Sequence, residues 1–189
     1  MSAQSGELWV VRHGETVWSR EGRHTSRTDV ALTPAGEAAA SALAARLAGV
    51  SFDLVLTSPR LRARRTAELA GFAHAQVEDD LAEWDYGDYE GRTTAEIREE
   101  SPDWTVWTRA CPGGETAEEV GRRLDRVIAK AHAHGGRVLA FGHGHASRVL
   151  AARWIGQPVA EGRSFGLDTA TISILGHERE TPVVARWNS

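Results

Sequence analysis

The sequence predicts an α/β fold: a three-layer sandwich in which a mainly parallel sheet carries helices on both faces. Short apolar runs alternate along the chain with longer stretches of helical composition, an order typical of parallel sheets with crossover helices. Three of the apolar runs are followed by polar residues of types common in active sites, at Arg12, Ser58 and His143. Because ligands of such folds bind outside the carboxyl ends of the strands, we expect these three ends to form one site.

The first half of the chain is predicted to contain three strands and two helices. In order, they are a strand at 8–11, a helix at 33–47, a strand at 52–56, a helix at 60–69 and a short strand at 77–81. The strands are short apolar runs bounded by polar residues. Thr33-Pro34 and Ser58-Pro59 each combine a hydroxyl that can cap a helix with a proline suited to its first turn.

The second half repeats this alternation and ends in two strands. Its predicted elements are a helix and loop at 92–107, a helix at 116–134, a strand at 138–141, a helix at 146–155, and strands at 171–175 and 183–187. Gly135-Gly136 ends the longest helix. Neither an internal repeat nor a long linker divides the chain, so we predict a single domain over residues 1–189.

Composition excludes several classes of protein. The chain has 189 residues, 41% hydrophobic and 25% charged, which is typical of a globular protein and not of a disordered one. The sequence shows neither an apolar run of the ~20 residues that a membrane span needs nor a secretory signal. A net charge of -4 argues against binding nucleic acid by bulk charge. The single cysteine, Cys111, favours a reducing compartment, so we expect a cytoplasmic protein without membrane or nucleic-acid partners; a homo-oligomer stays open.

The residue types at the strand ends suit a phosphoryl group. Arg12 and His13 follow the first strand, Arg62 lies in the helix after the second, and His143 follows the strand at 138–141. Arginine is a rigid fork of donors that matches phosphate oxygens, and neutral imidazole is a nucleophile. Gly14 is expected to let a ligand approach the backbone closely.

Five motifs in this order resemble the histidine phosphatase superfamily, with its phosphoglycerate-mutase-like fold. They are Arg12-His13-Gly14-Glu15-Thr16 with Trp18, Thr57-Ser58-Pro59-Arg60-Leu61-Arg62-Ala63 with Thr66-Ala67, Glu83-Trp84-Asp85-Tyr86-Gly87 with Glu90-Gly91, Pro112-Gly113-Gly114-Glu115-Thr116, and Gly142-His143-Gly144. The resemblance runs from about residue 8 to residue 175. The interval between the third and fourth motifs looks most like small actinobacterial acid phosphatases, and the second and third motifs also resemble the sedoheptulose-bisphosphatase branch.

The resemblance implies a metal-independent phosphomonoester hydrolase of the acid phosphatase type that acts on small phosphorylated metabolites and needs no cofactor. His13 would attack phosphorus and become phosphohistidine. Arg12, Arg62 and His143 would hold the phosphoryl oxygens and stabilise charge in the transition state. Glu83 would protonate the leaving oxygen and then deprotonate the water that cleaves the phosphoenzyme.

Four further residues are expected to contact the substrate. Ser19 stands where the family often has asparagine, and Thr25 lies in a stretch that resembles the family's substrate loop. Arg60 adds a second helix arginine that would face a second anionic group of the substrate. His145 follows the last motif. His24 is expected on the surface, and Trp104 and Trp107 are expected either in the core or in the wall of the pocket.

Three alternatives stay open. A phosphoglycerate mutase is the first, although the interval after Gly91 is short and lacks the lysine and adjacent arginines of true mutases. The second is a non-catalytic phosphate-binding module, which would require loss of His13, Glu83 or His143. The third is a metal site at the His-x-His pair of His143 and His145, but no acidic or cysteine set completes it, so no metal is expected.

Overall fold

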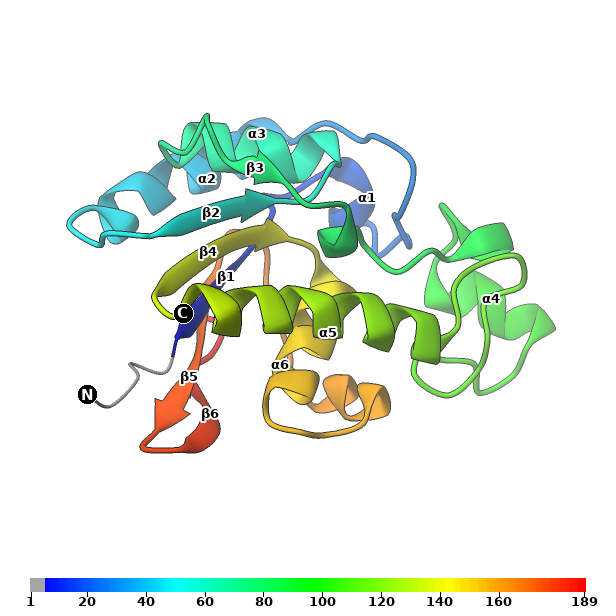
Figure 1. The fold of residues 1–189 in the computed structure, drawn as a ribbon. Coiled ribbons are helices and arrows are strands. Elements are labelled where there is room, and N and C mark those ends of the chain that lie inside the picture. The colour runs from blue at the N-terminus through cyan, green and yellow to red at the C-terminus, as the bar shows by residue number, and fades with distance from the viewer. Residues whose placement is uncertain (1–5) are drawn as a thin grey trace.

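A six-stranded sheet forms the centre of the molecule in the computed structural model, which describes residues 6–189 (Figure 1). The strands are β1 (Glu7–Arg12), β2 (Leu54–Thr57), β3 (Gln76–Val77), β4 (Arg137–Gly142), β5 (Ile172–Glu178) and β6 (Thr181–Arg186). They are ordered β3-β2-β4-β1-β5-β6. β3, β2, β4 and β1 are parallel to one another, whereas β5 is antiparallel to β1 and β6 is antiparallel to β5. The predicted mainly parallel sheet is confirmed.

Helices cover both faces of this sheet (Figure 1). The long ones are α2 (Pro34–Leu47) and α3 (Leu61–Leu69) on one face, and α5 (Ala117–His134) and α6 (Gly144–Trp154) on the other. Side chains of neighbouring residues in β1 pack against opposite helical layers, because side chains alternate along a strand. Val10 belongs to the apolar cluster that includes α5 and α6, and Val11 belongs to the cluster that includes α2 and α3. The three-layer sandwich is therefore confirmed.

The shorter elements were the hardest to predict. They are α1 (Val17–Arg20), α4 (Thr94–Glu100) and the 3₁₀ turns η1 (Asp79–Leu81), η2 (Gly87–Tyr89) and η3 (Val159–Ser164). The strand predicted at 77–81 consists of β3 alone and then turns into η1, because the carboxylate of Glu78 accepts from the Asp80 N–H and starts the turn. An element of one or two turns is too short to show the helical period by which helices are recognised in a sequence.

One predicted helix cap is confirmed and another is wrong. Thr33 caps α2, since its hydroxyl accepts from the Gly36 N–H at 3.0 Å. Ser58 does not cap α3, which begins after Arg60 without a side-chain cap. The Ser58 N–H instead continues the parallel ladder to the carbonyl of Phe141 at 2.9 Å, so its hydroxyl stays at the sheet edge. Ser58 is thereby available to the site described below.

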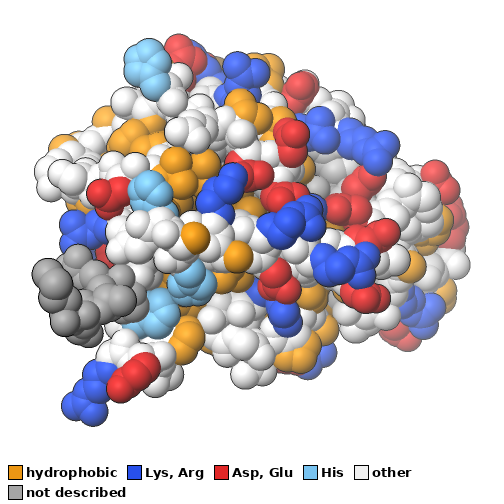
Figure 2. All heavy atoms as spheres, in the orientation of Figure 1, with side chains coloured by type: hydrophobic (Ala, Val, Ile, Leu, Met, Phe, Trp, Pro, Cys, Tyr) orange, Lys and Arg blue, Asp and Glu red, His pale blue; other side chains and the backbone are white. Residues whose placement is uncertain are grey.

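Charged side chains of both signs are interspersed on the face shown in Figure 2. Along α5, which lies at the front of this view, Arg122 pairs with Glu118 at 2.8 Å and Lys130 pairs with Glu78. Exposed pairs of this kind contribute little to stability. They do leave this face without a large patch of one sign. Among residues 6–189, no helix combines the length and the apolar character needed to cross a membrane.

Candidate active site

Two histidines meet where β1 and β4 end. The strands run in parallel register with Arg12 opposite Gly142. The ladder continues one step further, because the His13 N–H donates to the carbonyl of Gly142 at 3.0 Å. The rings of His13 and His143 therefore lie edge to face, with their centroids 5.3 Å apart. The predicted convergence of the strand ends is present in the structure.

His13 is oriented so that Nε2 carries its free lone pair. Its Nδ1 lies 2.7 Å from the carbonyl oxygen of Gly14, which can only accept, so the proton sits on Nδ1. Burial, followed by the nearby charges of Arg62 and Arg12, lowers the pKa of His13 well below 6.5. The neutral imidazole is the nucleophilic form, and this environment favours it near neutral pH.

Gly14 is needed by a neighbouring helix, a reason that the sequence does not show. A Cβ on Gly14 would lie 2.5 Å from the carbonyl oxygen of Gly36, in the first turn of α2. A Cβ on Gly36 would in turn lie 2.2 Å from the carbonyl oxygen of Glu15. The Gly14 N–H donates to the hydroxyl of Thr66 in α3 at 3.0 Å. Two helices therefore clamp the turn that carries His13.

Two buried arginines flank His13, and backbone carbonyls hold both of them. Arg12 donates to the carbonyl of Leu167, while Arg62, fully buried, donates to those of Thr25 and Thr28 at 2.9 and 3.0 Å. Burial lowers the pKa of both guanidinium groups. In each of them Nε is buried and has no hydrogen-bond partner among residues 6–189. A buried donor without a partner costs free energy, so these two suit an anionic acceptor.

His143 presents a third such donor. Its Nε2 lies 2.7 Å from the hydroxyl of Ser58, and that hydroxyl accepts from the Arg60 N–H at 3.3 Å. We assign the Ser58 proton to Nε2, because the hydroxyl has no other acceptor among residues 6–189, and this leaves the proton of the ring on Nδ1. Within the described part of the chain Nδ1 is buried without a partner. Burial and the charge of Arg62 lower the pKa of His143 well below 6.5, so it donates as a neutral ring.

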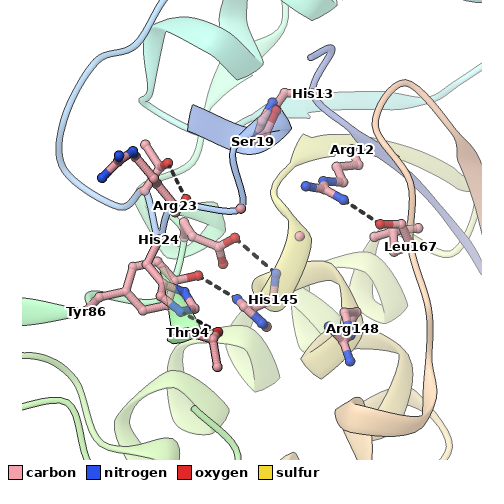
Figure 3. Close-up of a pocket in the computed structure, with 14 residues that line it drawn as sticks. Arg12, His13, Ser19, Arg23, His24, Tyr86, Thr94, His145, Arg148 and Leu167 are labelled. Carbon is pink, nitrogen blue, oxygen red and sulfur yellow. Dashed lines mark hydrogen bonds between the residues drawn. The ribbon is translucent and has the colours of Figure 1, made fainter. Parts of the chain in front are cut away.

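Glu83 is bound by the N-terminus of α6, the helix that carries the His145 labelled in Figure 3. The Oε1 of Glu83 accepts from the N–H groups of Trp84 at 2.9 Å and Ala146 at 2.8 Å, whereas Oε2 accepts one bond from residues 6–189, from the N–H of His145 at 3.0 Å. Because a carboxylate oxygen offers two lone-pair positions, Oε2 keeps one free. The side chain lines the same cavity as His13.

This cavity has a volume of about 250 Å³, and it brings together most of the predicted site residues. Six of them line it: Arg12, His13, Ser19, Thr25, Glu83 and His145. Arg62 and His143 do not line it: both are fully buried, and the His143 ring packs on that of His13. Arg60 lines a separate cavity of about 220 Å³ that is also bordered by Glu83. The Ser19 hydroxyl is already engaged with the backbone of Thr16, to which it donates at 3.0 Å.

His24 is not on the surface, and that expectation is wrong. It is 9% exposed, lines the cavity, and places Nε2 3.2 Å from the hydroxyl of Thr94. Its ring packs against Tyr86 and Trp104 at centroid distances of 4.7 and 5.2 Å. Burial lowers the pKa of His24 to about 4. The backbone N–H of His24 donates to the carbonyl of Arg92, which lies far along the chain. No local sequence pattern predicts such a contact.

His143 and His145 have separate partners. The Nδ1 of His145 lies 2.6 Å from the hydroxyl of Tyr86. Burial raises the pKa of Tyr86 well above 10 and lowers that of His145 well below 6.5, so the phenol donates and the ring accepts. Over residues 6–189 no three His, Cys, Asp or Glu side chains are grouped as cation ligands. Because His143 contacts Ser58 whereas His145 contacts Tyr86, the structure does not favour a metal ion shared by the two histidines.

Arg148 is a cation of the cavity wall that sequence reasoning missed. It donates to the carbonyls of Gly162 and Arg163, both at 3.0 Å, and its guanidinium lies 4.6 Å from the ring centroid of Trp107. Trp107 does not itself line the cavity but packs against Arg148, and Trp104 is buried in the core. One signal was available: Arg148 stands four residues after Gly144, so the two share one face of α6.

Comparison with known proteins agrees with this geometry. Residues 8–189 match the Histidine phosphatase superfamily (branch 1). An acid phosphatase from Mycobacterium tuberculosis is 46% identical over 182 residues, 94% of this chain and 90% of that protein. A sedoheptulose 1,7-bisphosphatase from Saccharomyces cerevisiae is 39% identical over 146 residues, 64% of this chain and 54% of that protein. A solved structure from Mycobacterium tuberculosis has a TM-score of 0.92 at 44% identity and covers 97% of both chains. The chain therefore belongs to the histidine phosphatase superfamily and is a phosphatase of that family.

Proposed function

We propose that this phosphatase hydrolyses small phosphomonoesters through a phosphohistidine intermediate on His13, without a metal ion. One observation carries the proposal. The free Nε2 of a neutral His13 lies among three buried donors without partners in the described chain, on Arg12, Arg62 and His143. A transferring phosphoryl group supplies oxygens for such donors. The cavity of about 250 Å³ suits a small leaving group.

In the first step, the Nε2 lone pair of His13 forms a bond to phosphorus. The bond between phosphorus and the ester oxygen breaks, and its electron pair stays on that oxygen. Glu83 gives this oxygen a proton and is left as a carboxylate. Oε2 is the better placed oxygen, because it accepts one backbone N–H and Oε1 accepts two. The products are an alcohol and phosphohistidine.

In the second step, water attacks the phosphorus of phosphohistidine. Glu83 takes a proton from that water, and the bond between nitrogen and phosphorus returns its electron pair to Nε2 of His13. Inorganic phosphate leaves, and both residues regain their starting states. Arg12 and Arg62 hold the phosphoryl oxygens throughout, because the same carbonyl contacts fix their guanidinium groups in both steps.

Thorough chelation is expected to leave the rate of hydrolysis unchanged. Arg12 and Arg62 supply the positive charge that a metallophosphatase draws from its cation. The measurement is kcat/KM for a phosphomonoester before and after dialysis against a strong chelator, with metal content followed by elemental analysis. If activity falls on chelation and returns with zinc or magnesium, the metal alternative at His143 and His145 must be revived.

A phosphate-release assay tests the proposed hydrolysis against the mutase alternative. Of the interval 92–111, only Thr94 lines the cavity. Arg92 pairs with Glu100 at 2.9 Å, and Arg98 donates to the carbonyl of Trp104 at 2.9 Å, so both are engaged within their own segment. We therefore expect net release of inorganic phosphate across a panel of small phosphomonoesters. Interconversion of 2- and 3-phosphoglycerate faster than phosphate release would establish the mutase instead.

The proposal extends to the setting and partners of the enzyme. We place it in the cytoplasm with a small phosphorylated substrate and neither nucleic acid nor membrane as a partner. The single cysteine supports a reducing compartment, because the sequence offers it no partner for an internal disulfide. A homo-oligomer is compatible with this function.

A further inference from the structure

The proposed reaction gives no role to the motif at 112–116, although its glutamate reaches the segment that carries Glu83. We propose that Arg123 and Glu115 act together as positioning residues that fix Glu83 for proton transfer to the leaving group. The proposal rests on the proposed role of Glu83 as the acid. The residues on either side of Glu83 form no regular helix or strand, so contacts from outside that segment must hold it in place.

Arg123, in the second turn of α5, uses all five of its N–H donors. It donates through Nη1 to the carbonyls of Asp80 and Ala82 at 2.8 and 2.7 Å, and through Nη2 to that of Glu83 at 3.2 Å. Its remaining two donors form a bidentate pair with Glu115 at 2.8 and 2.9 Å. Arg123 is 8% exposed. A planar fork of five donors makes this arrangement, which the point charge of lysine cannot reproduce.

Glu115 holds the residues that follow Glu83. Its Oε2 accepts from the Asp85 N–H at 2.9 Å, and its own N–H donates to the Asp85 carbonyl at 2.9 Å. Its carbonyl accepts from the indole N–H of Trp84 at 2.9 Å. Arg123 and Glu115 thus bind the backbone before, at and after Glu83, and the ion pair between them joins the two sets of contacts.

The glycines of the two motifs make this approach possible. A Cβ on Gly114 would lie 2.3 Å from the carbonyl oxygen of Asp85. A Cβ on Gly87, where φ is +52°, would lie 2.1 Å from the carbonyl oxygen of Pro112. Backbone therefore packs directly on backbone between the third and fourth motifs. This contact brings Glu115 within reach of Asp85 and Arg123.

Glu83 is consequently held from two sides. The first turn of α6 binds its carboxylate through the N–H groups of His145 and Ala146. The beginning of α5, the end nearest α4 in Figure 1, binds its backbone through Arg123. Proton transfer depends steeply on distance, and a shift of about 1 Å in a reacting group can cost ~10²-fold in rate. Removing the contacts of Arg123 is therefore expected to slow proton transfer from Glu83 to the leaving group.

The test compares an alkyl phosphate with p-nitrophenyl phosphate in single-turnover release of the alcohol. Nitrophenolate leaves without a proton, so only the alkyl ester needs a well placed acid. Arg123→Met is expected to slow the alkyl ester by about 10²-fold and the nitrophenyl ester by less than about 5-fold. Glu115→Gln, a milder change that keeps the backbone contacts, is expected to show the same pattern with smaller losses, which covers the case of a poorly folded Arg123→Met.

Arg126→Gln is the matched control. Arg126 lies one turn further along α5 and pairs with the side chain of Asp80 at 2.8 Å, but 63% of its side chain is exposed. Arg126→Gln removes one positive charge beside the same segment, as Arg123→Met does. We expect its rates for both esters to stay within about twofold of the wild type. In a Glu83→Gln background, Arg123→Met should slow the alkyl ester by less than about 3-fold, because the group through which it acts is already lost.

The outcomes are distinguishable. If Arg123→Met slows both esters equally, the pair only stabilises the fold and the positioning role is overturned. The same conclusion follows if Arg123→Met slows the alkyl ester as much in the Glu83→Gln background as in the wild type. If Glu83→Gln itself shows no dependence on the leaving group, the acid role of Glu83 is wrong, and the positioning proposal fails with it. Selective slowing of the alkyl ester by Arg123→Met, with Arg126→Gln unaffected, supports the proposal.

Discussion

Replacing His13 with alanine is expected to lower kcat by about 10⁵-fold while the fold persists, since loss of a catalytic nucleophile costs rates of that order. The imidazole holds the lone pair at Nε2 that forms the bond to phosphorus, and the structure places no second nucleophile there with the same surroundings. His143 Nε2 is occupied by the Ser58 hydroxyl. The measurement is phosphate release from a phosphomonoester, with circular dichroism to establish that the variant folds.

A trapped phosphoenzyme gives the second readout for His13. Wild-type enzyme quenched during turnover should carry phosphate that acid removes and base does not, and the alanine variant should carry none. His74→Ala is the matched control, because His74 is exposed and lies outside the cavity. An active His13→Ala enzyme, or wild-type turnover without any such label, would refute the assignment.

The protonation of His13 is expected to set the pH dependence of kcat/KM in acidic solution. The pKa of His13 lies well below 6.5, so the neutral form persists into acidic solution and activity is lost only as the pH falls through that lowered value. We expect the acid limb of kcat/KM below pH 6.5, once the titration of the substrate phosphate near pH ~6 is allowed for. An acid limb of the enzyme at or above pH 6.5 would contradict the neutral, buried nucleophile.

Replacing Glu83 with glutamine is expected to slow phosphorylation by an alkyl phosphate by about 10²- to 10⁴-fold, the usual contribution of a general acid. The amide keeps the shape of the side chain, and its oxygen can still accept N–H groups of α6, but it has no acidic proton to give. p-Nitrophenyl phosphate should be slowed much less in the same step. Single-turnover release of the alcohol measures this step separately from hydrolysis of the phosphoenzyme.

The second step provides a check on the same variant. Glu83 is also needed to deprotonate water, so the phosphoenzyme of Glu83→Gln should accumulate even when p-nitrophenyl phosphate is the donor. A burst of nitrophenol equal to the enzyme concentration, followed by slow turnover, is the expected trace. Equal slowing of both esters in the burst would show that Glu83 only positions the phosphate. The acid would then have to be sought at Asp85 or Glu15.

Much of this molecule could be predicted because the signals are local. The alternation of apolar runs and helical stretches gave the correct sheet class, and Thr33 before Pro34 marked the start of α2. The convergence of His13 and His143 followed from strand polarity alone, since parallel strands end at the same edge. Each of these inferences needed only residues close together in the chain and a rule of backbone geometry.

The contacts that complete the site join segments far apart in the chain, and only the folded structure reveals them. His24 is buried because its ring packs against Tyr86 and Trp104, and Gly14 is needed because α2 packs on it. Arg123 reaches Glu83 across 40 residues. A sequence records which donors and acceptors a chain possesses. Their pairing depends on which backbone groups are left unsatisfied once the layers have packed, and that is a property of the whole fold.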